Sequence, residues 1–292
     1  MKKFAFPTFR DVYNFAPKYK LQHLKFTLRC LFSRNNIKAF ETFVNTCESY
    51  LNFFRNRSQD AYPLIHAYMD KRFNGKQRLS VMTNDLKAAR SLFGQRAFAQ
   101  IAHADSSTNS IVLSQLTDEL SLCLHRNDNC VDEGWWAVSL RDTANQRLYA
   151  ATFAFINHRL VVGSVQGPAG EHAKDLVKKL TKQLHGLRPQ NLVVTALQYL
   201  AACLSLENIA GISQADQVKL RWRLKKRVQM DYDVFWQNVD AKLHDDGYWH
   251  LPAIPTRKEL TEIESKKRSM YRKRYEILDK LFADTATCLQ TN

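Results

Sequence analysis

The segment Gly186-Leu187-Arg188-Pro189 combines residue types that suit an anion-binding site. Proline fits the first position of a helix, because its missing N–H would have no partner there, so we expect a helix to begin at Pro189. The free N–H groups of that helix end would point at the Gly186 loop, with Arg188 and Lys182 beside it. The alternative is an ordinary turn between two helices, and these residues alone favour neither interpretation.

Two other groups of residues have suitable chemistry. Gln166 and Gly167 begin a Gly-Pro-Ala-Gly turn, in which glycine allows a ligand to approach the backbone closely. The alternative is a turn that only leaves a sheet. Tyr232 lies between Asp231 and Asp233, and these residues could transfer protons if they were buried. The alternative is that the aromatic residues of this segment belong to the core and the aspartates to the surface.

Basic residues are concentrated in two predicted helical stretches, at 219–227 and 266–274. The candidates for binding a polyanion are Lys219, Arg223, Lys226, Arg227, Lys267, Arg272 and Arg274. Aromatic residues are interleaved with both stretches, as in proteins that bind nucleic acids. Acidic residues flank the second stretch and partly neutralise it. No nucleic-acid-binding signature accompanies either stretch, so the sequence does not support recognition of specific bases.

The composition is that of a basic globular protein. Of its 292 residues, 43 are Lys or Arg and 28 are Asp or Glu, which gives a formal net charge of +15, and 45% are hydrophobic. This excess indicates an anionic partner, either nucleic acid, an anionic membrane surface or a phosphorylated ligand. A basic surface without a partner is the alternative.

Several classes of protein are disfavoured by what the sequence lacks. The cysteines form no C-x-x-C and the histidines no metal-binding cluster, so we expect a reduced, intracellular protein without a metal. No apolar run is long enough for a signal peptide or a transmembrane helix, which predicts a cytoplasmic protein, with peripheral contact to the inner membrane as a variant. A Walker loop, a G-x-S-x-G motif and a Rossmann fingerprint are missing as well.

The hydrophobic pattern predicts an α+β fold with an antiparallel or mixed sheet. Apolar and polar residues alternate, as is typical of strands, at 110–116, 120–126, 134–142, 148–156 and 159–167. A helix over Pro189–Leu204 and a strand over Asn208–Ser213 would complete the core.

Helical stretches flank this core and divide the chain into three predicted parts. These are an N-terminal helical region (1–105), the α+β core (106–255) and a basic C-terminal helix with a tail (256–292). Within the first part, one helix face is formed by Leu21, Leu24, Leu28, Leu31 and Phe32. One interpretation is a helical cap with a solvated basic face. The other is a helix lying on an anionic bilayer surface.

Turn and capping residues predict further helix boundaries in the N-terminal part. We expect helices to start at Pro63 and at Thr83 or Asn84, an end at Gly94, and a turn at Asn74.

The C-terminal half is predicted to hold two helices. A basic helix is expected over 217–239, and a long helix from Thr256, where Glu259 would complete a capping box.

Seven short motifs follow one another along the chain. They are VQGP at 165–168, TK at 181–182, HGLRP at 185–189, YDVFW at 232–236, LP at 251–252, SKKR at 265–268 and YRKRY at 271–275. In this order they resemble motifs of the VirK-like proteins of Gram-negative bacteria, over about residues 20–282. The resemblance implies a role in virulence and cell-envelope integrity, without an established biochemical activity.

A second resemblance lies inside the first. The stretch 183–188, QLHGLR, is similar to the Q/R-x-x-G-x-G/A loop that holds the pyrophosphate of acyl-CoA in GNAT acyltransferases. Two features depart from that pattern, because Arg188 replaces the final small residue and a helix over 171–185 precedes the loop.

The GNAT resemblance implies an acyl-CoA-dependent acyltransferase of unknown acceptor. The residues that would bind or lie near acyl-CoA are Gln166, Gly167, Lys182, Gly186, Leu187, Arg188 and Pro189. Tyr232 is the candidate acid. The alternatives are a non-catalytic binder of nucleic acid or anionic lipid, through the two basic stretches, and a structural adaptor.

Overall fold

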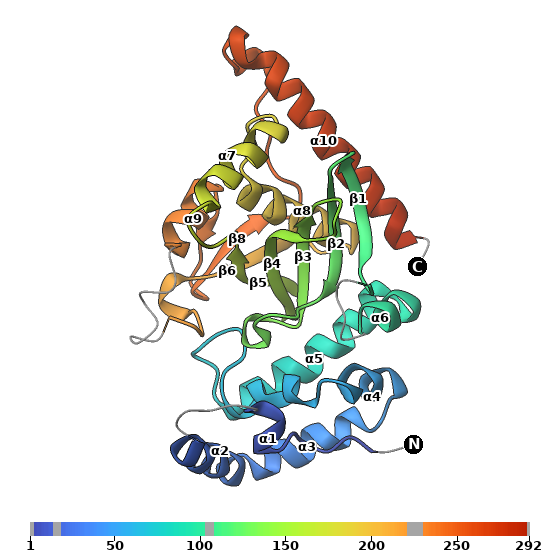
Figure 1. Ribbon diagram of the computed structural model, residues 1–292, viewed down its shortest axis with the longest axis vertical. Helices are drawn as coiled ribbons and strands as arrows, with labels where there is room; N and C mark the ends of the chain where they lie inside the picture. Colours follow the sequence, from blue (N-terminus) through green and yellow to red (C-terminus); the bar gives the residue numbers. More distant parts are fainter. Residues whose placement is uncertain (1–2, 14–18, 103–107, 221–229, 291–292) are drawn as a thin grey trace.

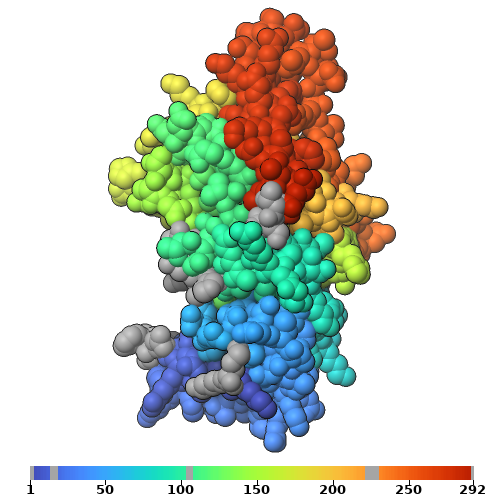
Figure 2. Space-filling view, turned by 90° about the vertical axis from the view of Figure 1, so that its right-hand side faces the viewer, coloured from blue at the N-terminus to red at the C-terminus, as the bar shows by residue number. Residues whose placement is uncertain are grey.

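The computed structural model describes residues 3–13, 19–102, 108–220 and 230–290. Its architecture is α+β, as predicted, with an N-terminal helical region, one eight-stranded mixed sheet and a long C-terminal helix (Figure 1). Figure 2 shows the C-terminal helix at the opposite end of the molecule from the N-terminal helices. One hydrophobic cluster contains buried residues from all three parts, and the division into three domains stays a prediction.

The sheet contains all five strands predicted before residue 168. Its strands are β1 (Ile111–Thr117), β2 (Leu120–Arg126), β3 (Trp136–Arg141), β4 (Arg147–Ile156), β5 (Arg159–Gln166), β6 (Asn208–Ile212), β7 (Lys242–Leu243) and β8 (Tyr248–Pro252). Their order is β1-β2-β3-β4-β5-β6-β8-β7, and only the β5–β6 pair is parallel. A parallel pair needs a crossover connection, which is supplied by α7 (Ala173–Gln183) and α8 (Pro189–Cys203).

Helices pack against this sheet and extend the core. The other helical elements are α1 (Phe9–Val12), α2 (Tyr19–Phe32), α3 (Arg34–Val44), α4 (Glu48–Arg55), η1 (Ser58–Ile65), α5 (Gly75–Phe93), α6 (Gln95–Ile101), η2 (Val131–Glu133), η3 (Gln214–Asp216), α9 (Tyr232–Asn238), η4 (Leu260–Glu262) and α10 (Ser265–Gln290). α8 is apolar on most sides and packs on β3 to β6, whereas α10 packs on β1 and α8. Burial of this apolar surface drives the assembly.

Two helix boundaries in the N-terminal region differ from prediction. α5 starts at Gly75 because the Asn74 side chain accepts hydrogen bonds from the N–H groups of residues 76 and 77, so Asn74 is a cap and the predicted start at Thr83 or Asn84 was wrong. Pro63 lies inside the 3-10 helix η1 and starts no helix. The predicted end at Gly94 is confirmed, since that residue has a φ of 80°.

Two boundaries in the C-terminal half differ as well. The chain is not helical over 217–220, residues 221–229 lie outside the described part, and α9 starts only at Tyr232. The long helix α10 starts at Ser265 instead of Thr256. Before it, Glu259 caps the short helix η4, and Ile263 is extended and buried.

Candidate functional site

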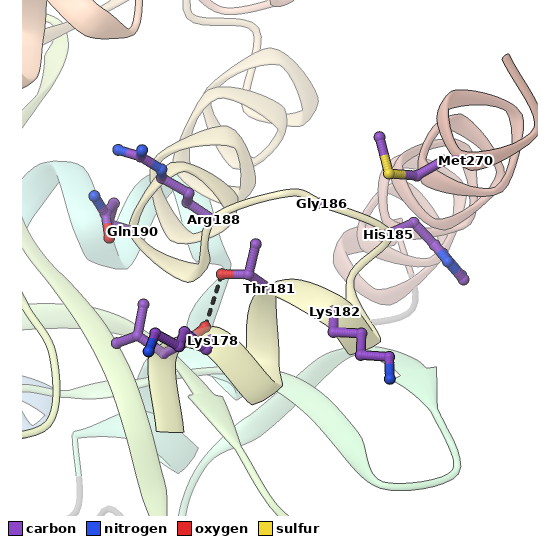
Figure 3. Close-up of a pocket in the computed structure, with 9 residues that line it drawn as sticks. Lys178, Thr181, Lys182, His185, Gly186, Arg188, Gln190 and Met270 are labelled. Carbon is purple, nitrogen blue, oxygen red and sulfur yellow. Dashed lines mark hydrogen bonds between the residues drawn. The ribbon is translucent and has the colours of Figure 1, made fainter. Parts of the chain in front are cut away.

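A hollow of about 610 Å³ lies between α7, the α7–α8 loop and α10 (Figure 3). Its lining consists of Val177, Lys178, Thr181, Lys182, His185, Gly186, Arg188, Gln190 and Met270. Three of these side chains are cationic and none is acidic. The size and the charge of this basic hollow suit an anionic small molecule.

The loop beside the basic hollow is shaped by the way α7 ends. His185 and Gly186 have φ values of 50° and 78°, and the Gly186 N–H donates to the Thr181 carbonyl at 2.7 Å. A Cβ at Gly186 would lie 2.8 Å from a guanidinium nitrogen of Arg274 and 3.1 Å from the sulfur of Met270. The backbone angle therefore favours glycine, and a larger residue would also displace the ends of the Arg274 and Met270 side chains.

Arg274 holds α10 against this loop. Its guanidinium donates twice to the His185 carbonyl, at 3.0 and 3.1 Å, and lies 4.1 Å from the centroid of the Tyr271 ring. Carbonyls near a helix C-terminus carry partial negative charge, so a cation is favourable there. Arg274, which was predicted to contact a polyanion, therefore makes its hydrogen bonds within the protein.

The predicted helix start at Pro189 is confirmed. Arg188 is extended, with a ψ of 136°, as a residue before proline prefers, and Pro189 occupies the first turn of α8. Because Arg188 and Gln190 line the basic hollow, the positive end of the α8 dipole lies at its edge.

The structure brings together three of the predicted ligand-binding residues. Lys182, Gly186 and Arg188 line the basic hollow, whereas Leu187 packs against the core and Pro189 is buried. Figure 3 shows the Arg188 and Lys182 side chains directed to different sides of the loop, so a ligand that touches both would have to be extended.

Gln166 belongs to a second polar group at the end of β5. Its amide nitrogen donates to the Glu133 carboxylate at 2.7 Å, and its amide oxygen accepts from Asn129 at 2.8 Å. One residue earlier, the N–H of Val165 donates to the Tyr232 hydroxyl at 3.2 Å. We call Glu133, Gln166 and Tyr232 the Glu133 cluster.

Burial dominates the electrostatics of the Glu133 cluster. Glu133 is 6% exposed, and desolvation raises its pKa to about 7, although a hydrogen bond with Ser164 and the charge of Lys219 act in the other direction. Burial, and secondarily the charge of Glu133, raise the pKa of the Tyr232 hydroxyl. Near neutral pH, Glu133 can therefore accept or release a proton, whereas Tyr232 stays protonated.

A glycine in β5 lets the backbone of Glu133 reach this position. A Cβ at Gly163 would lie 2.0 Å from the Glu133 carbonyl oxygen, which also accepts a hydrogen bond from the Thr152 hydroxyl at 2.7 Å. The pairing of β4 with β5 shifts register here, as expected at a bulge.

Lys219 and Cys130 adjoin the Glu133 cluster. The Lys219 ammonium, predicted to contact a polyanion, donates to the Asp132 carboxylate at 2.7 Å and is partly buried. Burial, followed by the charge of Glu133, raises the pKa of the Cys130 thiol to about 12. The thiol therefore stays protonated and is a poor nucleophile.

Tyr149 connects the basic hollow with the Glu133 cluster. Its hydroxyl donates to the Gln190 side chain at 3.3 Å, and a Cβ at Gly167 would lie 2.3 Å from a carbon of its ring. Gln190 lines the basic hollow and Gly167 follows Gln166, so the Tyr149 side chain lies between the two sites.

The two aspartates beside Tyr232 accept hydrogen bonds from different parts of the protein. Asp231 caps α9 by accepting from the Val234 N–H, and Asp233 accepts from the Gln214 N–H and the Trp249 indole, each at 2.9 Å. The interpretation that the aromatic residues belong to the core is confirmed for Tyr232, which is buried.

The remaining polyanion candidates fall into two groups, one outside and one inside the described residues. Arg223, Lys226 and Arg227 lie outside the described residues. Lys267 pairs with Glu264 at 3.2 Å, and Arg272 is exposed, both on α10.

Glu133 and Tyr149 were missed by reasoning from the sequence. Glu133 lies in the short 3-10 helix η2, and its partner Gln166 is 33 residues away in the chain. A local pattern cannot reveal that a turn carboxylate becomes buried against a distant strand.

Over the described ranges, no three His, Cys, Asp or Glu side chains are grouped to hold a metal ion. None of the described helices combines the length and the apolarity of a membrane span.

The fold and the site define a basic α+β protein with a cationic hollow beside a buried carboxyl group. The chain belongs to the family described as "Protein of unknown function (DUF535)", whose model matches residues 16–287, and that description assigns no activity. The resemblances to VirK-like proteins and to GNAT acyltransferases stay predictions. No solved structure matches the chain significantly.

Related proteins are found in several bacteria. An uncharacterized protein of Haemophilus influenzae is 32% identical over 287 residues, which cover 96% of this chain and 97% of that protein. Membrane protein LapB of Mannheimia haemolytica is 34% identical over 203 residues, 69% of this chain and 87% of LapB. Uncharacterized protein YbjX of Escherichia coli is 32% identical over 180 residues, 59% of this chain and 53% of YbjX.

Proposed function

We propose that this protein binds an acyl-CoA in the basic hollow and transfers the acyl group to an acceptor at the Glu133 cluster. The proposal rests mainly on the adjacency of two features: a cationic hollow at the start of α8, and a buried carboxyl group with a pKa near 7. The passage from β5 through α8 into the parallel strand β6 also supports a GNAT-like core.

The basic hollow would hold the phosphates of acyl-CoA. Arg188 and Lys182 offer charge-assisted hydrogen bonds, and the start of α8 adds the favourable end of its dipole. The extended arrangement of the two side chains suits a long ligand better than a single phosphate ion.

The Glu133 cluster would supply the proton transfers. The acceptor nucleophile attacks the thioester carbonyl carbon and gives its proton to the ionised Glu133 carboxylate. The carbon–sulfur bond then breaks, the Tyr232 hydroxyl donates a hydrogen bond to the leaving thiolate, and the protonated Glu133 carboxyl group returns the proton to it. The raised pKa values suit these roles, because Glu133 exchanges protons near neutral pH while Tyr232 retains its own.

Thermal unfolding with and without acetyl-CoA and longer acyl-CoAs tests the proposal. A ligand at about 100 times its dissociation constant should stabilise the protein by about 2.7 kcal/mol. Arg188→Ala should abolish this stabilisation. Arg272→Ala removes an exposed arginine that does not line the basic hollow and should leave the stabilisation intact.

Tyr232→Phe separates binding from chemistry. It keeps the ring and should retain the stabilisation by acyl-CoA while it slows release of free CoA thiol in the presence of an acceptor. No stabilisation of the wild-type protein by any acyl-CoA would refute the proposal.

A second candidate function is a non-catalytic binder of nucleic acid. The exposed basic residues in the first half of α10, which projects beyond the sheet in Figure 1, favour it. Binding to RNA or DNA should then weaken steeply with salt and should depend on Arg272 instead of Arg188.

We also propose a cytoplasmic protein that supports the integrity of the cell envelope. None of the six cysteines is part of a disulfide bond, which suits a reducing compartment. The name of the relative LapB, a membrane protein, supports a link to the envelope.

A further inference from the structure

α2 carries an apolar stripe that faces away from the protein. Six of the eleven large hydrophobic side chains that are exposed in the described part of the chain belong to this one helix. The stripe consists of Leu21, Leu24, Leu28, Leu31 and Phe32, each at least 43% exposed, and Phe32 is 86% exposed. Single exposed apolar residues are ordinary, but a contiguous group usually marks a contact surface.

The orientation of α2 is fixed by its opposite side. At about 100° per residue, the five side chains of the stripe fall within an arc of about 100°, and Phe26 lies about 170° from its centre. Phe26 is buried and packs its ring against Phe9 and Tyr62, while Arg29 donates to the Tyr62 hydroxyl at 2.6 Å. These contacts hold the stripe toward solvent.

Lysines border the stripe on both sides. Lys20 and Lys25 are exposed and fall about 20° beyond its two edges. The helix contains no acidic residue, and the first 60 residues of the chain carry eleven Lys or Arg against four Asp or Glu. An apolar stripe between cations is the arrangement of helices that lie in the interface of an anionic bilayer.

We propose that α2 docks this protein onto anionic lipid bilayers, with the stripe inserted at the level of the acyl chains and the two lysines among the headgroups. Charge complementarity favours a bilayer over a second copy of this chain. Two α2 helices packed stripe to stripe would bring four lysines together without an acidic residue of either helix to pair with them. The proposal does not depend on the activity of the basic hollow, because α7, which lines that hollow, lies far from α2 (Figure 1).

Co-sedimentation with phosphatidylcholine vesicles, with and without phosphatidylglycerol, tests this docking. The wild-type protein should bind only the vesicles that contain phosphatidylglycerol. Leu31→Ser with Phe32→Ser should weaken this binding about tenfold or more, because two apolar side chains no longer enter the bilayer. Lys20→Gln and Lys25→Gln should each weaken it about fivefold.

Leu243→Ser is the matched control, because Leu243 is 57% exposed on β7, outside the stripe. It should bind vesicles like the wild type, and all variants should keep the wild-type unfolding midpoint. Binding that survives Leu31→Ser with Phe32→Ser would overturn the proposal. A wild-type protein that binds no vesicles would overturn the proposal as well. If that protein is a dimer and the double variant is a monomer, the stripe is an interface between copies.

Discussion

Replacing Glu133 with glutamine tests whether the protein holds a carboxyl group in a state that suits proton transfer. A glutamate pKa raised from its ordinary 4.5 to about 7 means that burying the charged form costs about 3 kcal/mol. Glutamine has nearly the same shape and is neutral at every pH, so it avoids this cost.

The raised pKa fixes the direction of the pH dependence. The folded protein binds the Glu133 proton more tightly than the unfolded chain does. The resulting stabilisation is complete below about pH 4.5 and is lost as the pH rises through about 7. The free energy of unfolding of Glu133→Gln, relative to wild type, should therefore rise by about 3 kcal/mol between about pH 4.5 and 8.

Urea unfolding at a series of pH values measures this difference, with linear extrapolation to water. Other titrating groups are common to both proteins, so their contributions cancel in the difference. Glu171→Gln removes an exposed carboxylate and should give a nearly constant difference from wild type. A constant difference for Glu133→Gln as well would show that Glu133 ionises normally, and the proposed role in proton transfer would lose its basis.

Three further predictions concern stability and are measured by the same unfolding experiment. Gly186→Ala should lower the free energy of unfolding by about 3 kcal/mol. Gly170 also has a positive φ but has open space around it, so Gly170→Ala should lower this free energy by only about 1 kcal/mol. Equal losses would contradict the tight contact with α10. Asp85→Ala should lower the free energy of unfolding by about 3 kcal/mol, because the buried N–H groups of the Trp136 indole and of Phe155 lose their acceptor; a loss below about 1 kcal/mol would argue against that network. Asp60→Ala should cost about 4 kcal/mol by leaving Arg126 buried without its carboxylate at 2.6 Å, and a neutral effect would mean that water reaches the pair.

Elements whose signals are local could be predicted from the sequence. Alternation with a period of two predicted the five strands before residue 168, and a turn at Asn157 and His158, both with positive φ, joins β4 to β5. Pro189 predicted the start of α8, and Gly94 the end of α5. Steric limits on φ and the alternation of side chains across a strand both act over a few neighbouring residues, so a local pattern is enough to predict these elements.

Several helix starts escaped local reasoning because more than one residue could cap them. Thr83 and Asn74 are both good caps, and α5 uses the earlier one because Gln77 completes its capping box. Thr256 is also a good cap, but burial of Ile263 keeps the chain extended and delays α10 to Ser265. Packing over long distances decided between local options of similar free energy.

Which residues meet, and which faces stay open, depends on contacts between distant parts of the chain. The pKa of Glu133 depends on burial against β5, and the hydrogen bonds of Arg274 depend on a carbonyl 89 residues earlier in the chain. The spacing of Leu21 to Phe32 indicated one helix face, but not that Phe26, on the other side, would hold α2 to the protein. Periodicity specifies which side chains share a face, whereas the partner of that face depends on contacts that no single segment contains.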